Sequence, residues 1–323
     1  MFLEKVVAIC IPAYNEESQI SSVLQLMPEW VDHLVVINDA SSDNTANVVR
    51  AISKQDSRVK LIDLDSNKGV GGALAEGFFY CRTIDADVVV TVDGDGQMDL
   101  TELESLVGPI ARDEADYVKG NRFIGVTSWG EIPKIRLIGN ATLSLLTKIA
   151  SGYWGISDFQ SGYTAISKQM LFSVRWEDVY PRYGRPNDVI VQANLLNLRV
   201  MDVPIKALYG VGEKSTMKIR KVVFPIMKLL FFRFWQRLWR KYVVLDFHPL
   251  VFFYLYSVFS GALSAVLGVR FAYVWFTSGN VPLITSLGLA ITFTTFLNSI
   301  FFAFWMDMLA NDHLVIRQSK SKN

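Results

Sequence analysis

Val88-Val89-Val90-Thr91-Val92 runs directly into Asp93-Gly94-Asp95-Gly96-Gln97. A buried strand of this kind carries the residues after it to the carboxyl edge of a sheet, where open α/β folds bind their ligands. Two carboxylates two residues apart, with the amide of Gln97 close behind, offer the hard oxygen atoms that Mg²⁺ and Mn²⁺ prefer. The plain alternative is an acidic turn that only ends a strand. The stretch therefore predicts a metal site made of Asp93, Asp95 and Gln97.

Similar strand-like runs recur through the amino-terminal part of the chain, with helical patterns between them, at 6–11, 34–37, 59–64 and 88–92. This alternation predicts an α/β fold in which helices flank a parallel sheet. Tyr14 and Glu16 follow the first run and Asp39 follows the second, so we expect them at the same sheet edge as the metal site. Asp39 has no evident structural role, and a nucleotide base or ribose could donate hydrogen bonds to it; helix capping is the alternative.

A glycine-rich segment, 67–73, follows the third run. Its glycine spacing does not fit the dinucleotide-binding fingerprint, which also belongs after a first strand. We expect these glycines to let a helix pack close to the sheet, with Lys68 near a phosphate.

Composition narrows the functional class. The 323 residues carry a net charge of +1, and no zinc-finger, basic-zipper or RNA-binding pattern is present, so a nucleic-acid partner is not expected. Cys10 and Cys81 lie in apolar stretches, as buried thiols of a reducing compartment do. The first residues lack the features of a signal peptide, so we expect the amino-terminal part to be cytosolic.

Charge almost vanishes between residues 248 and 309. Two apolar runs there, about 249–270 and 282–309, are long enough to cross a membrane. Their flanks at 214–241 and 317–322 are basic, so we expect an integral membrane protein with two spans and with the amino-terminal domain and both termini cytosolic. Two very apolar helices of a soluble core are the alternative.

The segment 214–247 mixes basic and aromatic residues at roughly helical spacing. Such a pattern predicts basic amphipathic helices that lie in the membrane interface and contact lipids. A basic surface helix of the soluble domain is the alternative. The expected organisation is a cytosolic domain at 1–213, interfacial helices at 214–247, and two spans with a short tail at 248–323.

Six motifs in order give the chain a resemblance to a known family; they lie at 11–16, 38–45, 67–69, 93–97, 119–123 and 158–163. The chain resembles glycosyltransferase family 2, inverting enzymes with a GT-A nucleotide-sugar fold. The last two motifs and the two spans are similar to those of polyprenyl-phosphate sugar synthases, relatives of dolichyl-phosphate mannose synthase.

The resemblance implies roles residue by residue. The nucleoside of the donor would be held by Pro12, Tyr14, Glu16 and Asp39. A divalent metal on Asp93, Asp95 and Gln97, with Gly94 between the two carboxylates, would bridge the donor diphosphate. The acceptor phosphate would be received by Arg122, Arg136 and Asn140. The residues nearest the reacting centre would be Asp95, Arg122 and Asp158.

The sequence departs from the family pattern at one place. Many relatives carry an arginine three residues before a Gly-Glu-Ser-Lys stretch, and here Tyr209 takes that position. Lys214 is a candidate to supply the missing positive charge to the diphosphate, and Lys218 and Arg220 are others. The sequence leaves open whether the donor is a UDP-sugar or a GDP-sugar. It also leaves open whether the metal is Mg²⁺ or Mn²⁺, and whether the protein forms a homo-oligomer.

The expected activity is transfer of one sugar from the nucleotide to a polyprenyl phosphate at the cytosolic membrane face. One rival is a glycosyltransferase acting on a saccharide or polysaccharide; processive synthases carry Gln-x-x-Arg-Trp, and Gln236-Arg237-Leu238-Trp239-Arg240 is a near miss. The other rival is a non-catalytic, membrane-tethered protein that only binds nucleotide-sugars.

Overall fold

The computed structural model describes residues 1–124, 134–206 and 219–317; in the helices that begin at 134 and 219, side chains are described from residues 141 and 223 onward. The chain divides into two compact units, Met1–Phe234 with His313–Asn323, and Trp235–Asp312. The division falls within a helix near residue 234. The first part of the expected interfacial segment therefore belongs to the first unit.

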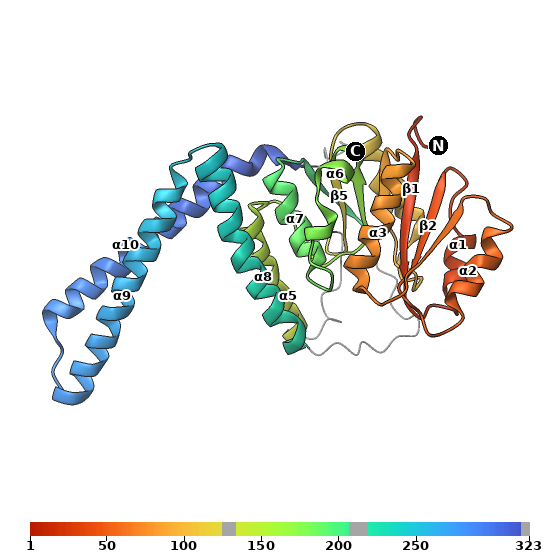
Figure 1. Cartoon of the computed structure of the whole chain (residues 1–323). Helices are drawn as coiled ribbons and strands as arrows, with labels where there is room; N and C mark the ends of the chain where they lie inside the picture. The colour runs from red at the N-terminus through yellow and green to blue at the C-terminus, as the bar shows by residue number, and fades with distance from the viewer. Residues whose placement is uncertain (125–133, 207–218, 318–323) are drawn as a thin grey trace. The chain divides into compact units, whose positions relative to one another are not determined.

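The first unit is built on an eight-stranded sheet with the order β3-β2-β1-β4-β6-β5-β7-β8 (Figure 1). Its strands are β1 Val7–Ala13, β2 His33–Asn38, β3 Val59–Asp63, β4 Val88–Thr91, β5 Tyr117–Asn121, β6 Thr164–Ser167, β7 Val200–Pro204 and β8 Val315–Ile316. Strands β1 to β4 pair in parallel, as expected, whereas β6 runs antiparallel to both of its neighbours. The expected helix-flanked α/β fold is confirmed, and the sheet is mixed.

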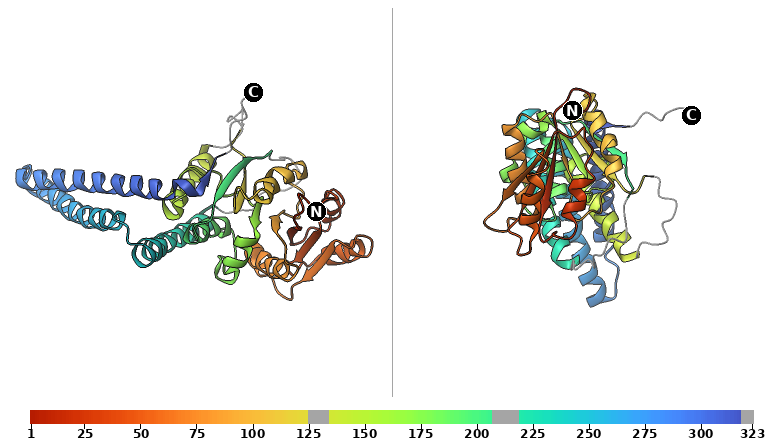
Figure 2. Two further views of the ribbon diagram at one scale, coloured as in Figure 1. Left: turned by 90° about the horizontal axis from the view of Figure 1, so that it is seen from above. Right: turned by 90° about the vertical axis from the view of Figure 1, so that its right-hand side faces the viewer.

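Helices cover both faces of this sheet (Figure 2). One core packs the sheet against α1 Ile20–Gln25, α2 Thr45–Ser53 and α4 Leu103–Ala111. The other packs it against α3 Gly69–Thr83, α6 Lys168–Ser173 and α7 Arg185–Leu195. The strands are buried on both faces, which explains their nearly continuous apolar runs.

The close approach expected of α3 is made by a different glycine. A Cβ at Gly77 would lie 2.7 Å from Ile37 Cδ1, so this glycine packs against the sheet. Gly71 instead packs against the loop before α7, where a Cβ would lie 2.7 Å from the Tyr180 carbonyl oxygen. The expectation for the first glycines of the segment 67–73 was therefore wrong about their partner.

Helix α8, Ile219–Trp239, begins in the first unit. Its inner face buries Ile226 and Leu230 against α5, Lys134–Ser151, and against α7. On the same face Arg233 forms an ion pair with the fully buried Asp188 of α7, with Nε 2.6 Å from Oδ1. Arg233 therefore faces the protein core and not lipid headgroups. This corrects the sequence interpretation, because a helical pattern gives a face of a helix but not the partner of that face.

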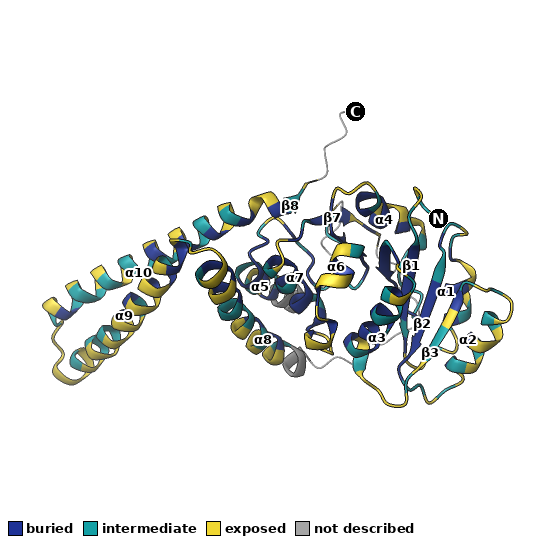
Figure 3. Ribbon diagram, turned by 45° about the horizontal axis from the view of Figure 1, so that its top comes forward, coloured by how far each residue is buried: buried dark blue, intermediate teal, exposed yellow. Residues whose placement is uncertain are grey.

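The exposed face of α8 in this unit is aromatic. Phe224, Phe231 and Phe232 are each more than half exposed, and Lys228 is exposed too. Figure 3 shows exposed residues, in yellow, along α8. The helix thus exposes apolar side chains on its outer face as well as burying them on its inner face, unlike a surface helix of a soluble domain, which is polar on its outer face.

The second unit contains the end of α8, a π-helical segment Arg240–Leu245, and two long helices, α9 Leu250–Ser278 and α10 Leu283–Asn311. Both long helices are apolar and long enough to cross a membrane. Only 33% and 11% of the residues in their most apolar windows are buried, which is unlike the helices of a soluble core. Helix α9 extends beyond the expected end at 270, and the turn begins at Gly279, whose φ of 67° suits glycine.

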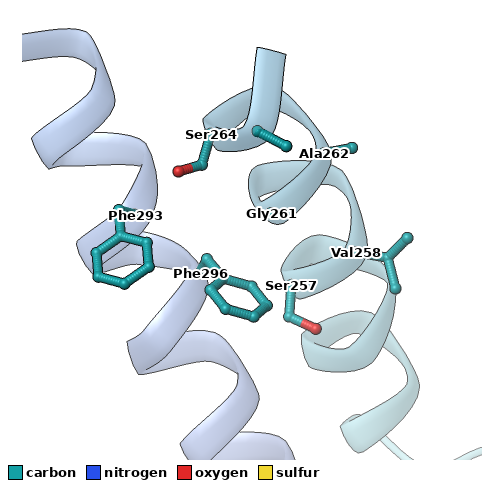
Figure 4. Close-up of a pocket in the computed structure, with 8 residues that line it drawn as sticks. Ser257, Val258, Gly261, Ala262, Ser264, Phe293 and Phe296 are labelled. Carbon is teal, nitrogen blue, oxygen red and sulfur yellow. The ribbon is translucent and has the colours of Figure 1, made fainter. Parts of the chain in front are cut away.

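Small residues of α9 let the two long helices approach. A Cβ at Gly261 would lie 2.9 Å from the Phe296 ring, and an open groove of about 420 Å³ lies between Ser257, Ser264 and Phe293 (Figure 4). Small residues at such contacts are typical of helices packed in a membrane.

A buried polar cluster closes the other end of this hairpin. Arg237 donates from Nη1 and Nη2 to the two oxygens of Asp307, each at 2.8 Å, and both side chains are fully buried. The Tyr242 hydroxyl donates to Asp307 Oδ1 at 2.8 Å, and Lys241 Nζ donates to Asn311 Oδ1 at 2.9 Å. Arg237 and Lys241 therefore face inward too, and the near-miss Gln-x-x-Arg-Trp stretch serves packing within this unit.

Candidate active site at the carboxyl edge of the sheet

Polar side chains from six segments meet at one edge of the sheet. Strands β1, β2, β4, β5 and β7 all end at this edge, and the antiparallel strand β6 begins there. The topology therefore brings together the residues after each of these strands and those before β6. Sequence reasoning anticipated this meeting for the first three loops and not for the later strands.

The acidic loop after β4 offers oxygen ligands to a cation. Asp93 and Asp95 are half-buried, and Asp95 Oδ1 accepts a hydrogen bond from the backbone amide of Gln97 at 3.0 Å. Gly94 allows the end of β1 to approach, because a Cβ there would lie 3.2 Å from the Pro12 carbonyl oxygen. The loop before β6 also reaches this site, since a Cβ at Gly162 would lie 3.4 Å from Asp93 Oδ2.

The electrostatics of this loop fit a divalent cation. Burial, and then the neighbouring Asp95, raise the pKa of Asp93 to about 6. A divalent cation held by these carboxylates would offset both effects. Across the described ranges no three His, Cys, Asp or Glu side chains cluster as a metal site. The protein would thus offer two carboxylates and the side-chain amide of Gln97, and Mg²⁺ commonly takes its other ligands from phosphate and water.

The loops after β1 and β2 hold each other in place. Asn15, with a φ of 60°, accepts a hydrogen bond at Oδ1 from the Ser42 amide at 2.8 Å. The Glu16 amide donates to Thr45 Oγ1 at 2.9 Å. Tyr14 is left half exposed at the edge, where a base or ribose can reach its ring.

Asp39 has a structural role, the helix capping that the sequence left open as the alternative. Its carboxylate is buried and accepts hydrogen bonds from the backbone amides of Lys68 and Gly69, at 2.7 and 2.9 Å. These amides stand at the first turn of α3, so the carboxylate caps that helix. The expectation of no structural role was wrong. Each carboxylate oxygen keeps further acceptor capacity, so the nucleoside role stays a prediction.

Arg122, directly after β5, and Asp158, in the loop before β6, are brought together. Nε and Nη2 of Arg122 donate to Oδ2 and Oδ1 of Asp158, each at 2.8 Å. The Arg122 amide donates to Oδ2 at 3.0 Å. Asp158 is 2% exposed, while one third of the Arg122 side chain stays accessible. The pair therefore presents a fixed cation at the edge of the site.

A second carboxylate holds the backbone next to both residues of this pair. Asp202 of β7 accepts hydrogen bonds at Oδ2 from Asn121 Nδ2 at 2.8 Å and from the Ser157 amide at 2.7 Å. These donors directly precede Arg122 and Asp158 in the chain. Lys119 is the register partner of Asp202 and is fully buried. Burial raises the pKa of Asp202 to about 6, although the Ser157 amide, Lys119 and Asn121 oppose the shift.

Sequence reasoning missed Asp202, because its role depends on the register between β5 and β7. Three predicted site residues lie beyond the described side chains. Arg136 and Asn140 lie on α5, whose side chains are described only from residue 141, and Lys214 lies outside the described residues.

Comparison with known proteins decides the family. Residues 8–173, just over half of the chain, match the model described as glycosyl transferase family 2. The chain belongs to glycosyl transferase family 2. The predicted family is confirmed, and the protein is accordingly a family 2 glycosyltransferase.

Two relatives with curated names are similar over most of their own length. A UDP-N-acetylglucosamine–dolichyl-phosphate N-acetylglucosaminyltransferase of Methanococcus voltae is 32% identical over 64% of this chain and 87% of that protein. A polyprenol monophosphomannose synthase of Mycolicibacterium smegmatis is 26% identical over 68% of this chain and 84% of that protein. The two names specify different sugars, N-acetylglucosamine and mannose.

A solved structure shares the fold. Glucosyl-3-phosphoglycerate synthase from Mycobacterium tuberculosis, in complex with Mn²⁺ and UDP-glucose, superposes with a TM-score of 0.52 at 19% identity, over 72% of this chain and 79% of that chain. At this identity the likeness establishes the fold alone. The predicted GT-A class is confirmed by this match and by the sheet topology.

Proposed function

We propose that this family 2 glycosyltransferase moves a single sugar, with inversion, from a UDP- or GDP-sugar to a polyprenyl phosphate at the cytosolic membrane face. The observation that carries the proposal is the Arg122–Asp158 pair at the same sheet edge as the Asp93–Asp95 loop. An anionic acceptor and a metal-bound donor would then meet at one edge. The names of the two relatives, a dolichyl-phosphate N-acetylglucosaminyltransferase and a polyprenol monophosphomannose synthase, support this acceptor class.

The donor half of the site would work by binding and orientation. Pro12, Tyr14, Glu16 and Asp39 would hold the nucleoside. Asp93, Asp95 and Gln97 would hold Mg²⁺ or Mn²⁺, and the Mn²⁺ and UDP-glucose bound by the structural neighbour support this assignment. The cation, when bound, stabilises the charge that develops on the leaving diphosphate.

The acceptor half would bind a phosphate monoester. Arg122 is held by both oxygens of Asp158, so its guanidinium is oriented before a substrate arrives. Arg136 and Asn140 would add to this phosphate site. A phosphate monoester is already anionic near neutral pH and needs little general-base assistance, unlike a sugar hydroxyl. Asp158 therefore acts by positioning Arg122 and not by removing a proton.

The membrane half of the proposal rests on chain connectivity. The chain leaves the first unit after Phe234 and returns to it at His313, and Val315 and Ile316 then pair with β7 of the catalytic sheet. Two spans, α9 and α10, would therefore leave from and return to one side of a membrane. The exposed aromatic residues of α8 would lie in the interface beside the acceptor headgroup.

The proposal is tested by offering purified full-length protein a choice of acceptors. With a sugar nucleotide and Mg²⁺, release of nucleoside diphosphate should depend on polyprenyl phosphate and stop with EDTA. Release that depends on an oligosaccharide would favour the saccharide-acceptor alternative. Binding of the nucleotide-sugar without release under any acceptor would favour the non-catalytic alternative.

A further inference from the structure

Gln160 lies in the loop that connects the two halves of the proposed active site. Asp158, two residues before it, binds Arg122 through both carboxylate oxygens. Two residues after it, a Cβ at Gly162 would lie 3.4 Å from Asp93 Oδ2. Because two residues of chain span at most about 7 Å, the Cα atom of Gln160 lies within that distance of both positions. Gln160 therefore starts between the proposed acceptor cation and the proposed metal loop.

The backbone of this loop is fixed on both sides of Gln160. Before it, the Ser157 amide donates to Asp202 Oδ2 at 2.7 Å. After it, the Ser161 amide donates to the Asp158 carbonyl oxygen at 3.2 Å and closes a turn around Gln160. The position of Gln160 is therefore set by the protein before a substrate arrives.

A buried chain of hydrogen bonds fixes the side chain of Gln160 as well. Its Nε2 donates to Oδ1 of Asn187, in the first turn of α7, at 3.2 Å. Asn187 Nδ2 donates to Thr147 Oγ1 of α5 at 2.7 Å, and the Thr147 hydroxyl donates to the Leu143 carbonyl oxygen at 2.8 Å. Asn187 and Thr147 are both fully buried. Such a satisfied polar network holds its members in one arrangement.

This chain of hydrogen bonds has a fixed direction. A hydroxyl has a single hydrogen to donate, and Thr147 gives it to Leu143, so its oxygen can only accept from Asn187. Asn187 must then turn its NH₂ group to Thr147 and its carbonyl oxygen to Gln160. Gln160 must turn its own NH₂ group to Asn187 for the same reason. The side-chain oxygen of Gln160, Oε1, is left at the open end of the chain.

The oxygen at this open end is an unused acceptor. Among the residues that the structure describes, none donates a hydrogen bond to Gln160 Oε1, and the side chain is half-buried and not enclosed. An amide oxygen can only accept, so a neutral ligand group that pairs with it must carry a hydrogen on oxygen or nitrogen. The esterified diphosphate of a nucleotide-sugar has no such hydrogen near neutral pH, whereas the sugar has several hydroxyl groups.

We propose that Gln160 Oε1 accepts a hydrogen bond from a hydroxyl group of the donor sugar. This inference rests on the proposed function and deepens it, because it names a residue that contacts the sugar. In a transfer with inversion the acceptor attacks the sugar from the face opposite the leaving group. The sugar then lies between the metal loop and Arg122, which is where Gln160 starts. A sugar without that hydroxyl would leave Oε1 unpaired and bind more weakly.

The test compares Gln160→Leu with the wild type, as full-length protein in detergent with Mg²⁺. The donor is first identified as the UDP- or GDP-sugar that the wild type turns over with polyprenyl phosphate. Calorimetry without acceptor then measures the affinity for this donor and for the matching UDP or GDP, which lacks the sugar. Gln160→Leu should bind the donor about fivefold or more weakly, the loss expected for one hydrogen bond, and should bind the nucleoside diphosphate as the wild type does.

The direction of the chain is tested away from the substrate by Thr147→Val. Without the hydroxyl, Asn187 is free to reverse its amide, and Gln160 can then present NH₂ in place of Oε1. Donor affinity should fall by less than in Gln160→Leu, with nucleoside diphosphate affinity unchanged. The double variant should bind the donor as Gln160→Leu does, because the direction no longer matters without the amide. A double variant that binds more weakly still would overturn the role of the chain.

The matched control is Gln55→Leu. Gln55 is exposed and lies before β3, at the sheet edge opposite the site. This change should leave both affinities unchanged.

Equal donor affinity in the wild type and Gln160→Leu would overturn the assignment and leave the proposed function standing. Equal losses of affinity for the donor and for the nucleoside diphosphate would show a general effect on the loop or the metal, and would overturn it too. If the wild type turns over no nucleotide-sugar with polyprenyl phosphate, the proposed function fails and this inference fails with it.

Discussion

Arg122 and Asp158 share two side-chain hydrogen bonds of 2.8 Å, although 36 residues separate them in the chain. Asp158 also has a φ of 28°, a backbone conformation that a residue with a side chain rarely adopts. Strain of this kind persists where the surrounding structure fixes it, and it concentrates at functional sites. Here the Asp202 carboxylate fixes it, by binding the Ser157 amide next to Asp158.

The pair should behave as one unit in catalysis. Arg122→Ala and Asp158→Asn should each lower kcat/KM for polyprenyl phosphate by roughly a hundredfold, and the double variant should be little worse than the weaker single variant. Steady-state kinetics of the three variants measure this coupling. Losses that multiply in the double variant would show independent roles. Arg112→Ala, which breaks an exposed ion pair with Glu114, is the control that should keep full activity.

Metal-dependent turnover should require the Asp95 carboxylate. Asp95→Ala should abolish turnover yet leave the melting temperature within a few degrees, because the half-buried carboxylate makes one described hydrogen bond, to the Gln97 amide. The nearby Asp99→Ala is the control: it removes a cap in which the Asp99 carboxylate accepts hydrogen bonds from the amide and hydroxyl of Thr101. This loss should cost about 1 kcal/mol of stability and leave activity intact. Near-normal turnover by Asp95→Ala would exclude the metal assignment.

Asp202 should make stability depend on pH. Its pKa rises from 3.8 to about 6 on folding, so the folded state favours the protonated form. The free energy of unfolding should therefore fall as pH rises from about 4 to about 6, by at most about 3 kcal/mol. Asp202→Asn removes this loss, so its melting temperature relative to the wild type should increase over that interval. A difference that stays constant with pH would contradict the account.

Arg233 and Lys228 should act on different properties, although both are basic residues of α8. Arg233→Ala leaves the buried Asp188 without its partner and should destabilise the catalytic domain by about 3–5 kcal/mol. Lys228→Ala, at an exposed position, should leave stability unchanged and weaken binding to anionic vesicles slightly. Thermal unfolding and vesicle flotation separate the two effects. A large loss of vesicle binding with normal stability in Arg233→Ala would restore the original view of this helix.

The ion pair between Arg237 and Asp307 should dominate the stability of the hairpin unit. Asp307→Ala leaves a buried guanidinium uncompensated and should cost about 3–5 kcal/mol, while the double variant Arg237→Met with Asp307→Leu should recover most of that loss. Unfolding in detergent, followed by tryptophan fluorescence, measures both. A double variant no more stable than Asp307→Ala would show that the hydroxyl of Tyr242 and the amide of Asn311 need the charges.

The sequence was sufficient to predict those parts of the fold and of the site that depend on neighbouring residues of the chain. Apolar runs located β1 to β4, and the residues after them reached one edge because parallel strands end together. It was insufficient where partners are far apart in the chain. Arg233 and Arg237 look like membrane-facing residues until Asp188 and Asp307 are placed beside them. One signal was available, since an ionisable residue such as Asp307 in an apolar span usually has a buried partner.

The role of Asp202 could be seen only in the fold. Asp202 meets Asn121 through the register of β5 and β7, two strands far apart in the chain. No local sequence pattern marks this position.

The most direct test of the central claim is a donor panel on the purified full-length protein in detergent. Each common UDP- and GDP-sugar, labelled in the sugar, is incubated with Mg²⁺ or Mn²⁺ and polyprenyl phosphate, and the lipid phase is analysed. One donor should yield a lipid-linked monosaccharide and an equal amount of nucleoside diphosphate. Transfer of the labelled sugar to an added oligosaccharide, with none to the lipid, would contradict the central claim.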